Sequence, residues 1–193
     1  MGENQSKKVS LPLTKASAAS LHAGDVVSLT GVMYSARDAA HARMTEEAAK
    51  MRDAGETVRY PFDLAGQVVY YLGPTPARPG EVIGSAGPTT ASRMDKYTPE
   101  LLDAGLLGMV GKGKRSPAVI EAMKRNGAVY FAAIGGAGAL LSQCIKKSEV
   151  IAYDDLGTEA IREMWVEDFP AVVVIDAEGN NLYESAVEAY RQV

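Results

Sequence analysis

Short apolar segments that alternate with helix-start signals constrain the fold of this chain more than any other feature of its sequence. Residues 128–134 and 171–176 are rich in β-branched, aromatic and small apolar side chains, and their length predicts buried strands. Thr98-Pro99 and Ser116-Pro117 each place a capping residue before a proline, which is typical of the first turn of a helix. This alternation predicts an α/β fold, or a mixed α+β fold, with a layered sheet.

A strand followed by one long helix is expected in the N-terminal third of the chain. Residues 26–34 form a β-branched apolar run that predicts the strand. Ser35 and Asp38 have the spacing of a capping box, in which each side chain satisfies a free backbone donor at the start of a helix. The helix is therefore expected over residues 36–54.

Three further strand patterns lead into short polar segments. Residues 68–72 and 109–110 predict two of these strands, and the second delivers Lys112 at its C-terminal end. Residues 82–86 predict the third, followed through a Gly-Pro turn by Thr89-Thr90. A helix is expected to begin at these threonines and to present free N–H groups there.

The composition favours one globular domain. The chain has 193 residues, of which 47% are hydrophobic, so we expect a single domain over residues 1–193 with a flexible N-terminal segment, residues 1–10. Its formal charge of −4 gives no field that would draw the chain to nucleic acid. We find neither the apolar core of a signal peptide nor a membrane-length apolar run, so a cytoplasmic location without membrane contact is expected.

The single cysteine limits metal chemistry. Cys144 alone cannot form an intramolecular disulfide, and it cannot provide the ligands of a zinc or iron–sulfur site. No metal site is therefore expected in this chain.

Three basic residues, Arg37, Arg93 and Lys112, stand where a strand pattern passes into a helix or loop. Because α/β folds expose functional side chains at such junctions, the three together predict an anion pocket. His41 follows Arg37 by four residues and is expected on the same helix face. Capping and salt bridging use the same kinds of position, and for His41 a hydrogen bond to the backbone or to Asp38 remains open as an alternative to a catalytic role.

The motifs of the chain, in order, resemble a known enzyme family. They are R-D-A-A-H, G-P-T-T-x-x-R-M-D, G-K-G, Y-F-x-A-x-G-G, D-L-G-x-E-A, D-F-P and I-D-x-x-G-N-N-L-Y. This series, from about Gly24 to Tyr183, is similar to the C-terminal domain or β subunit of class I fumarases and of the related tartrate dehydratases. The resemblance implies a layered β/β/α swivelling domain that packs against an α subunit, in an α2β2 heterotetramer. The α subunit would hold a [4Fe-4S] cluster on three cysteines, with the fourth iron open to substrate.

The resemblance also implies roles for individual residues. Arg37, Arg93 and Lys112 correspond to ligands of a small dicarboxylate substrate, and Thr89 to the base that removes the C3 proton. Supporting positions that also match are Asp38, His41 and Thr90. Thr89 and Arg93 would meet on one helix face if the helix begins at or before Thr89.

These residues agree with the chemistry of hydration. Adding water to fumarate needs a charged group for each carboxylate, a base for the C–H proton and an electrophile for the hydroxyl; Arg provides a fork and Lys a point charge. The expected function is that of a β subunit of a two-subunit fumarate hydratase, which hydrates fumarate reversibly to (S)-malate only with its α subunit. The alternatives are an L(+)-tartrate dehydratase β subunit and a non-catalytic dicarboxylate-binding or regulatory module.

Overall fold

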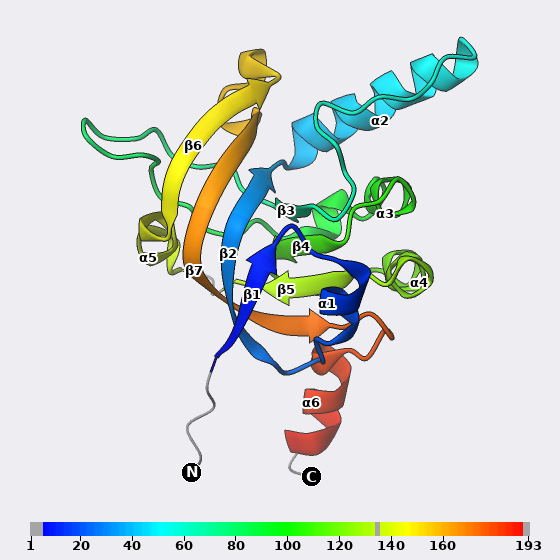
Figure 1. The fold of residues 1–193 in the computed structure, drawn as a ribbon, viewed down its shortest axis with the longest axis vertical. Coiled ribbons are helices and arrows are strands. Elements are labelled where there is room, and N and C mark those ends of the chain that lie inside the picture. Colours follow the sequence, from blue (N-terminus) through cyan, green and yellow to red (C-terminus); the bar gives the residue numbers. More distant parts are fainter. Residues whose placement is uncertain (1–5, 134–135, 191–193) are drawn as a thin grey trace.

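The fold is a mixed α/β domain with a closed, barrel-like sheet (Figure 1). The structure, a computed structural model, describes residues 6–133 and 136–190. In chain order the elements are β1 (Lys7–Leu11), α1 (Lys15–Ala19), β2 (Val26–Ser35), α2 (Asp38–Asp53), β3 (Val68–Tyr70), the 3₁₀ helix η1 (Ala91–Met94), α3 (Thr98–Asp103), β4 (Gly108–Gly111), α4 (Pro117–Asn126), β5 (Val129–Ala132), α5 (Gly138–Gln143), β6 (Ile145–Ala152), the 3₁₀ helix η2 (Asp154–Glu159), β7 (Ile161–Ile175) and α6 (Leu182–Tyr190).

The long strand β7 closes the sheet. The strand order is β1-β2-β3-β4-β5-β7-β6, and β7 also pairs antiparallel with β2. Its first part lies between β2 and β6, and its last residues pair with β5. Strands β2, β3, β4 and β5 are parallel neighbours, so their carboxyl ends lie at one edge of the sheet.

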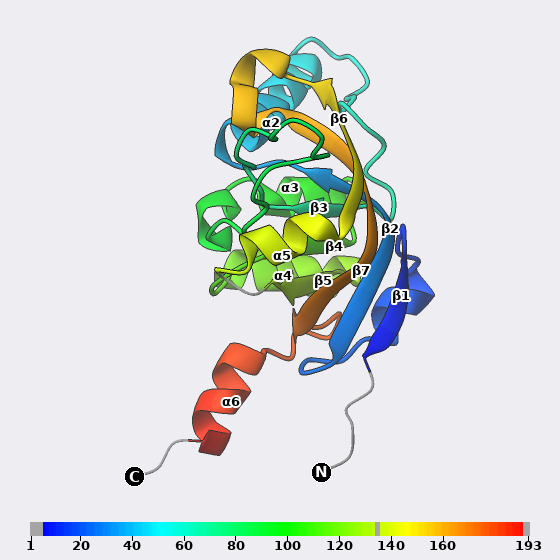
Figure 2. The same ribbon diagram turned by 90° about the vertical axis from the view of Figure 1, so that its left-hand side faces the viewer.

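Two hydrophobic clusters lie on opposite faces of β3, β4 and β5. Val68 and Tyr70 point into the cluster shared with β2 and β7, whereas Val69 and Tyr71 point into the cluster shared with α2, α3 and α4. This alternation follows from the two-residue period of a strand. Figure 2 shows α3 and α4 on one side of these strands and β2 and β7 on the other.

The strongest local signals are confirmed. Helices α3 and α4 begin at the two predicted cap-proline pairs, and α4 ends at Gly127, whose φ of +62° terminates a helix at low cost. Strands β2, β3, β4 and β5 lie within or nearly within the segments predicted for them. The run at residues 171–176 is the end of β7, which begins ten residues earlier than its apolar run.

The predicted capping box at Ser35 is wrong. Ser35 is the last residue of β2, where it pairs with Tyr70 on one side and Arg162 on the other. Because the sheet holds Ser35 extended, α2 begins only at Asp38, with Arg37 as its cap residue and without a hydrogen bond from the Arg37 side chain to the helix.

Two other predictions are corrected in the segment before α3. Residues 82–86 are not a strand but part of a loop that folds back on itself, with Ser85 N–H bonded to the Thr75 hydroxyl at 2.8 Å. A Cβ on Gly84 would collide with the Thr75 carbonyl, so this glycine permits the close approach. The helix expected at Thr89-Thr90 is only the four-residue η1, which begins at Ala91.

The N-terminal segment expected to be flexible includes β1. Lys7–Leu11 pair in parallel with Val27–Gly31 of β2, so residues 7–10 are part of the sheet, while residues 1–5 lie outside the described residues. In the part of the chain that the structure describes, no helix has the length and apolar character needed to cross a membrane.

Candidate active site

The carboxyl ends of β2, β3 and β4 bring the predicted site residues to one edge of the sheet. Strand β2 ends two residues before Arg37, and β4 ends immediately before Lys112. Between them, the chain leaves β3 and passes through Tyr71 to Gly73, which lies against the guanidinium of Arg37. The carboxyl ends of parallel strands, here β2, β3 and β4, are a common place for ligand sites in α/β folds.

Asp38 joins the two predicted arginines. Its Oδ2 accepts a hydrogen bond from Arg37 Nε at 3.3 Å, and its Oδ1 accepts one from Arg93 Nε at 2.8 Å. The Arg37 side chain is 24% exposed and that of Arg93 is 51% exposed, so both can be reached from solvent. The Asp38 carboxylate therefore holds the two guanidinium groups side by side. It contacts each of them through Nε and not through a terminal nitrogen.

A backbone ladder places Thr89 and Thr90 beside Lys112. Lys112 N–H donates to the Thr89 carbonyl at 3.2 Å, and Ala91 N–H donates to the Lys112 carbonyl at 2.8 Å. Thr89 N–H in turn donates to the Tyr71 carbonyl at 2.7 Å. The expectation of free N–H groups at a helix start is thus wrong for Thr89, whose amide is bonded within the sheet extension.

Arg93 reaches the site from η1, which follows the threonines directly. Its own N–H donates to the Thr90 carbonyl at 3.4 Å. Because η1 begins only at Ala91, Thr89 and Arg93 are not successive positions on one α-helix, and the stated condition for their meeting on one helix face is not fulfilled.

Glycines allow the close packing of this edge. A Cβ on Gly111 would lie 2.9 Å from Tyr71 Cδ2 and 3.2 Å from Ala91 Cβ, and one on Gly73 would lie 2.7 Å from Arg37 Nη1. Gly138 packs against Gly87 and would force it away if it carried a side chain. Gly135 of the Y-F-x-A-x-G-G motif lies outside the described residues.

His41 is buried beneath the site and does not share the exposed face of Arg37. Its Nδ1 donates to the Arg37 carbonyl at 3.0 Å. Its ring packs edge-on against Tyr71, with 5.5 Å between the two ring centroids. Burial lowers the pKa of His41 from 6.5 to about 4, so the ring is neutral at pH 7. Among the described residues its Nε2 has no hydrogen-bond partner. The backbone hydrogen bond, one of the two structural alternatives, is therefore present.

Two charged residues of the site were missed by sequence reasoning. Glu159 of η2 pairs with Arg37, with Oε1 3.0 Å from Nη2. Arg115 is buried and donates to Asp95 Oδ1 at 2.7 Å and to Thr98 Oγ1 at 2.9 Å, which ties the loop after Lys112 to the segment after Arg93. Glu159 stands in the D-L-G-x-E-A motif, which was a signal without an assigned role.

The described residues contain no group of three or more His, Cys, Asp or Glu side chains placed to hold a metal ion. Cys144, the lone cysteine, lies at the end of α5 rather than at this edge. A cluster that needs several thiolate ligands therefore does not fit the donor set of this chain.

Comparison with known proteins places the chain in a family. A family model described as the fumarase C-terminus matches residues 1–186. The chain belongs to this family.

Individual members of the fumarase family differ greatly in length. The chain is 42% identical over 164 residues to the anaerobic class I fumarate hydratase of Escherichia coli (strain K12), covering 83% of this chain but 29% of that protein. It is 43% identical over 161 residues to the mitochondrial fumarate hydratase 1 of Leishmania major, and the match covers 82% of this chain and 28% of that protein. It is 36% identical over 178 residues to a putative L(+)-tartrate dehydratase subunit beta of Methanocaldococcus jannaschii, and the match covers 89% of this chain and 88% of that protein. This fumarase-family chain thus spans under a third of the two fumarate hydratases.

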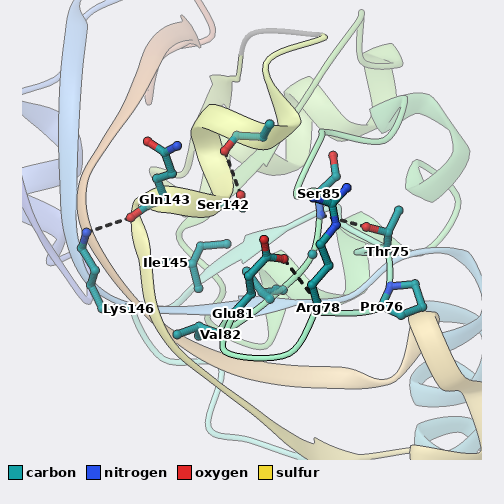
Figure 3. A pocket seen from close by; sticks show the side chains of 13 residues that line it. Thr75, Pro76, Arg78, Glu81, Val82, Ser85, Ser142, Gln143, Ile145 and Lys146 are labelled. Atoms are coloured by element: carbon teal, nitrogen blue, oxygen red, sulfur yellow. Dashed lines mark hydrogen bonds between the residues drawn. The ribbon is translucent and has the colours of Figure 1, made fainter.

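A separate cavity lies beside the site of this fumarase-family chain. It has a volume of about 590 Å³ and is lined by the loop of residues 75–85, by α5 and by the start of β6, with Arg78 and Lys146 among the lining side chains (Figure 3). Arg37, Thr89 and the other predicted site residues do not line it.

Proposed function

We propose that this chain is the β subunit of a two-subunit class I fumarate hydratase, which hydrates fumarate reversibly to (S)-malate. The observation that carries the proposal is the gathering of Arg37, Arg93 and Lys112 at one sheet edge beside Thr89. An α subunit, corresponding to the part of the longer fumarate hydratases that this chain does not cover, would hold the [4Fe-4S] cluster. The cluster would supply the electrophile for the hydroxyl group.

In this proposal the three cations bind the two substrate carboxylates. Asp38 occupies Nε of Arg37 and of Arg93, and Glu159 also faces Nη2 of Arg37. The terminal nitrogens of Arg93 are therefore the more open edge for a carboxylate, and Arg37 would bind through the N–H groups that Asp38 and Glu159 leave. Lys112 adds a single positive charge without the bidentate geometry of a guanidinium group. The two arginines and the lysine carry three positive charges, of which Asp38 and Glu159 offset two, so directed hydrogen bonds would have to supply much of the binding.

Thr89 would remove the proton at C3. A threonine hydroxyl is a weak base at its own pKa and needs neighbouring cations to stabilise the alkoxide. The backbone ladder brings the segment of Lys112 beside that of Thr89, with Thr90 as the bridge partner of Lys112, and the proposal needs the Lys112 ammonium to reach Thr89 from there. Thr90 and His41 would support this arrangement, Thr90 through the bridge to Lys112 and His41 through the Arg37 carbonyl.

We further propose that the chain is a single domain of the swivelling β/β/α type, in a cytoplasmic α2β2 heterotetramer. The two hydrophobic clusters on either side of β3, β4 and β5 support the layering. The near-complete coverage of a protein named as a subunit beta supports the separate partner chain.

Anaerobic reconstitution tests the proposed function. The isolated chain is expected to be inactive on fumarate, and addition of its α subunit with iron and sulfide is expected to give hydration to malate. Full activity of the isolated, iron-free chain would refute the proposal, as would an assembled complex that leaves fumarate unchanged.

The β subunit of an L(+)-tartrate dehydratase is the second candidate. The similarity to the Methanocaldococcus jannaschii protein over 88% of its length favours it. Comparison of malate and tartrate turnover by the assembled complex separates the two. A kcat/KM higher for tartrate than for malate would favour the dehydratase.

A further inference from the structure

Helix α2 lacks a local cap at the end where it meets the site. The first N–H groups of a helix have no partner within the helix and need an acceptor from elsewhere. Ser35 is held in β2, and the side chain of Arg37, the cap residue, makes no hydrogen bond to the helix. Some other part of the chain must therefore complete the start of α2.

Glu159 provides that acceptor from a distant segment. Its Oε2 accepts a hydrogen bond from Ala39 N–H at 2.7 Å, although the two residues are 120 positions apart. Its Oε1 lies 3.0 Å from Arg37 Nη2. Figure 2 shows η2, which carries Glu159, beside α2. One carboxylate thus bonds both the backbone at the helix start and the guanidinium beside it.

Three neighbours surround the guanidinium of Arg37. Asp38 binds Nε, Glu159 binds Nη2, and Gly73 lies so close to Nη1 that a Cβ there would be 2.7 Å from it. Among the described residues, by contrast, Arg93 has only Asp38 as a charged partner, and its side chain is about twice as exposed as that of Arg37. An anionic partner on Nη2 also offsets the repulsion between the two neighbouring guanidinium groups.

We propose that Glu159 is a positioning residue of the site, which orients Arg37 for a substrate carboxylate and caps α2 at the same time. The proposal rests on the proposed function for the role of Arg37. It gives the D-L-G-x-E-A motif a physical purpose: the motif brings a carboxylate from η2 to the start of α2.

A purely structural role is the competing explanation, because η2 also attaches to α2 elsewhere. Arg43 of α2 forms a two-pronged pair with Asp155 of η2, with both N–O distances 2.7 Å. This pair joins the same two elements but lies away from the arginines of the site. Asp155→Asn is therefore a matched control for loss of attachment alone.

The test compares Glu159→Gln, Glu159→Ala and Asp155→Asn in the complex reconstituted with the α subunit. Glutamine keeps an oxygen for Ala39 N–H but turns an uncharged amide toward Arg37. For Glu159→Gln we expect kcat/KM for fumarate to fall about 10- to 100-fold, mainly because KM rises. A decrease of this size corresponds to the loss of one charge-assisted hydrogen bond. Its Tm is expected to stay close to that of the wild type, whereas Glu159→Ala lowers both Tm and kcat/KM. Asp155→Asn is expected to leave KM unchanged.

The outcomes separate this inference from the proposed function. Wild-type complex that does not hydrate fumarate would refute the proposed function. Normal wild-type turnover with an unchanged KM in Glu159→Gln would refute the positioning role alone. A KM increase of equal size in Asp155→Asn would also refute it, because the effect would then come from attachment of η2 to α2.

Discussion

Lowering the pH is expected to destabilise this fold through His41. The ring is fully buried against Tyr71 and Tyr97, and burial lowers its pKa from 6.5 to about 4. The Arg37 carbonyl and Asp38 favour the protonated ring, while Arg115 opposes it, and burial outweighs them. Between these pKa values the unfolded chain binds a proton that the native chain does not. The stabilisation is therefore complete above pH 6.5 and is lost as the pH falls toward 4.

The size of this effect follows from the two pKa values of His41. Proton linkage with values of 6.5 and about 4 removes about 2 kcal/mol of unfolding free energy between about pH 7 and about pH 5. Urea unfolding followed by circular dichroism at several pH values measures it. Carboxylates also titrate in this range. The relevant quantity is therefore the difference between the wild type and His41→Asn in the pH dependence of the unfolding free energy. Asparagine keeps an N–H for the Arg37 carbonyl but does not titrate.

The matched control is His22, whose side chain is 68% exposed. His22→Asn removes an exposed histidine by the same substitution, and its pH dependence of unfolding is the baseline with which His41→Asn is compared. The reasoning is refuted if the wild type and His41→Asn lose the same free energy on acidification.

Two further predictions concern the packing beneath the site. Gly111→Ala is expected to cost about 1–3 kcal/mol of unfolding free energy, because the new methyl group crowds Tyr71 and the segment of Thr89; an unchanged urea midpoint would contradict this. Arg115→Met is expected to cost about 3–5 kcal/mol, because it leaves Asp95 without its buried partner. Arg125→Met is the control for Arg115→Met, since Arg125 forms a similar pair with an aspartate at the surface. Loss of the surface pair is expected to change the melting temperature little. An equal decrease in melting temperature in both variants would contradict the argument.

Local signals predicted the parts of the fold that depend on nearby residues. The cap-proline pairs gave the starts of α3 and α4 because the fixed φ of proline acts within one turn, although neither Thr98 nor Ser116 caps its helix through its side chain. The apolar run at residues 128–134 gave β5 because that strand is buried on both faces.

Other elements could not be read from local patterns. Strand β6, with the sequence IKKSEVIA, is mostly exposed and has no apolar run to identify it. The first ten residues of β7 are a strand because β2 and β6 pair with them, which is a tertiary cause. The same pairing kept Ser35 extended and overruled its capping-box spacing.

Sequence reasoning about the site named positions at strand ends but not the contacts between them, and the binding roles stay predictions. The three cations were predicted from their places at strand ends, and the structure brings these strand ends to one edge. The bridges made by Asp38 and Glu159 join residues 55 and more positions apart, so no local spacing predicts them.

The central claim is that Arg93 belongs to a clamp for a small dicarboxylate. Its most direct test is the steady-state hydration of fumarate by complexes that carry Arg93→Gln or, as a matched control, Arg125→Gln. We expect Arg93→Gln to lower kcat/KM by about 10- to 100-fold, the effect of one charged hydrogen bond, and Arg125→Gln to leave it unchanged. Equal kcat/KM values for Arg93→Gln and the wild type would contradict the claim and favour a non-catalytic module.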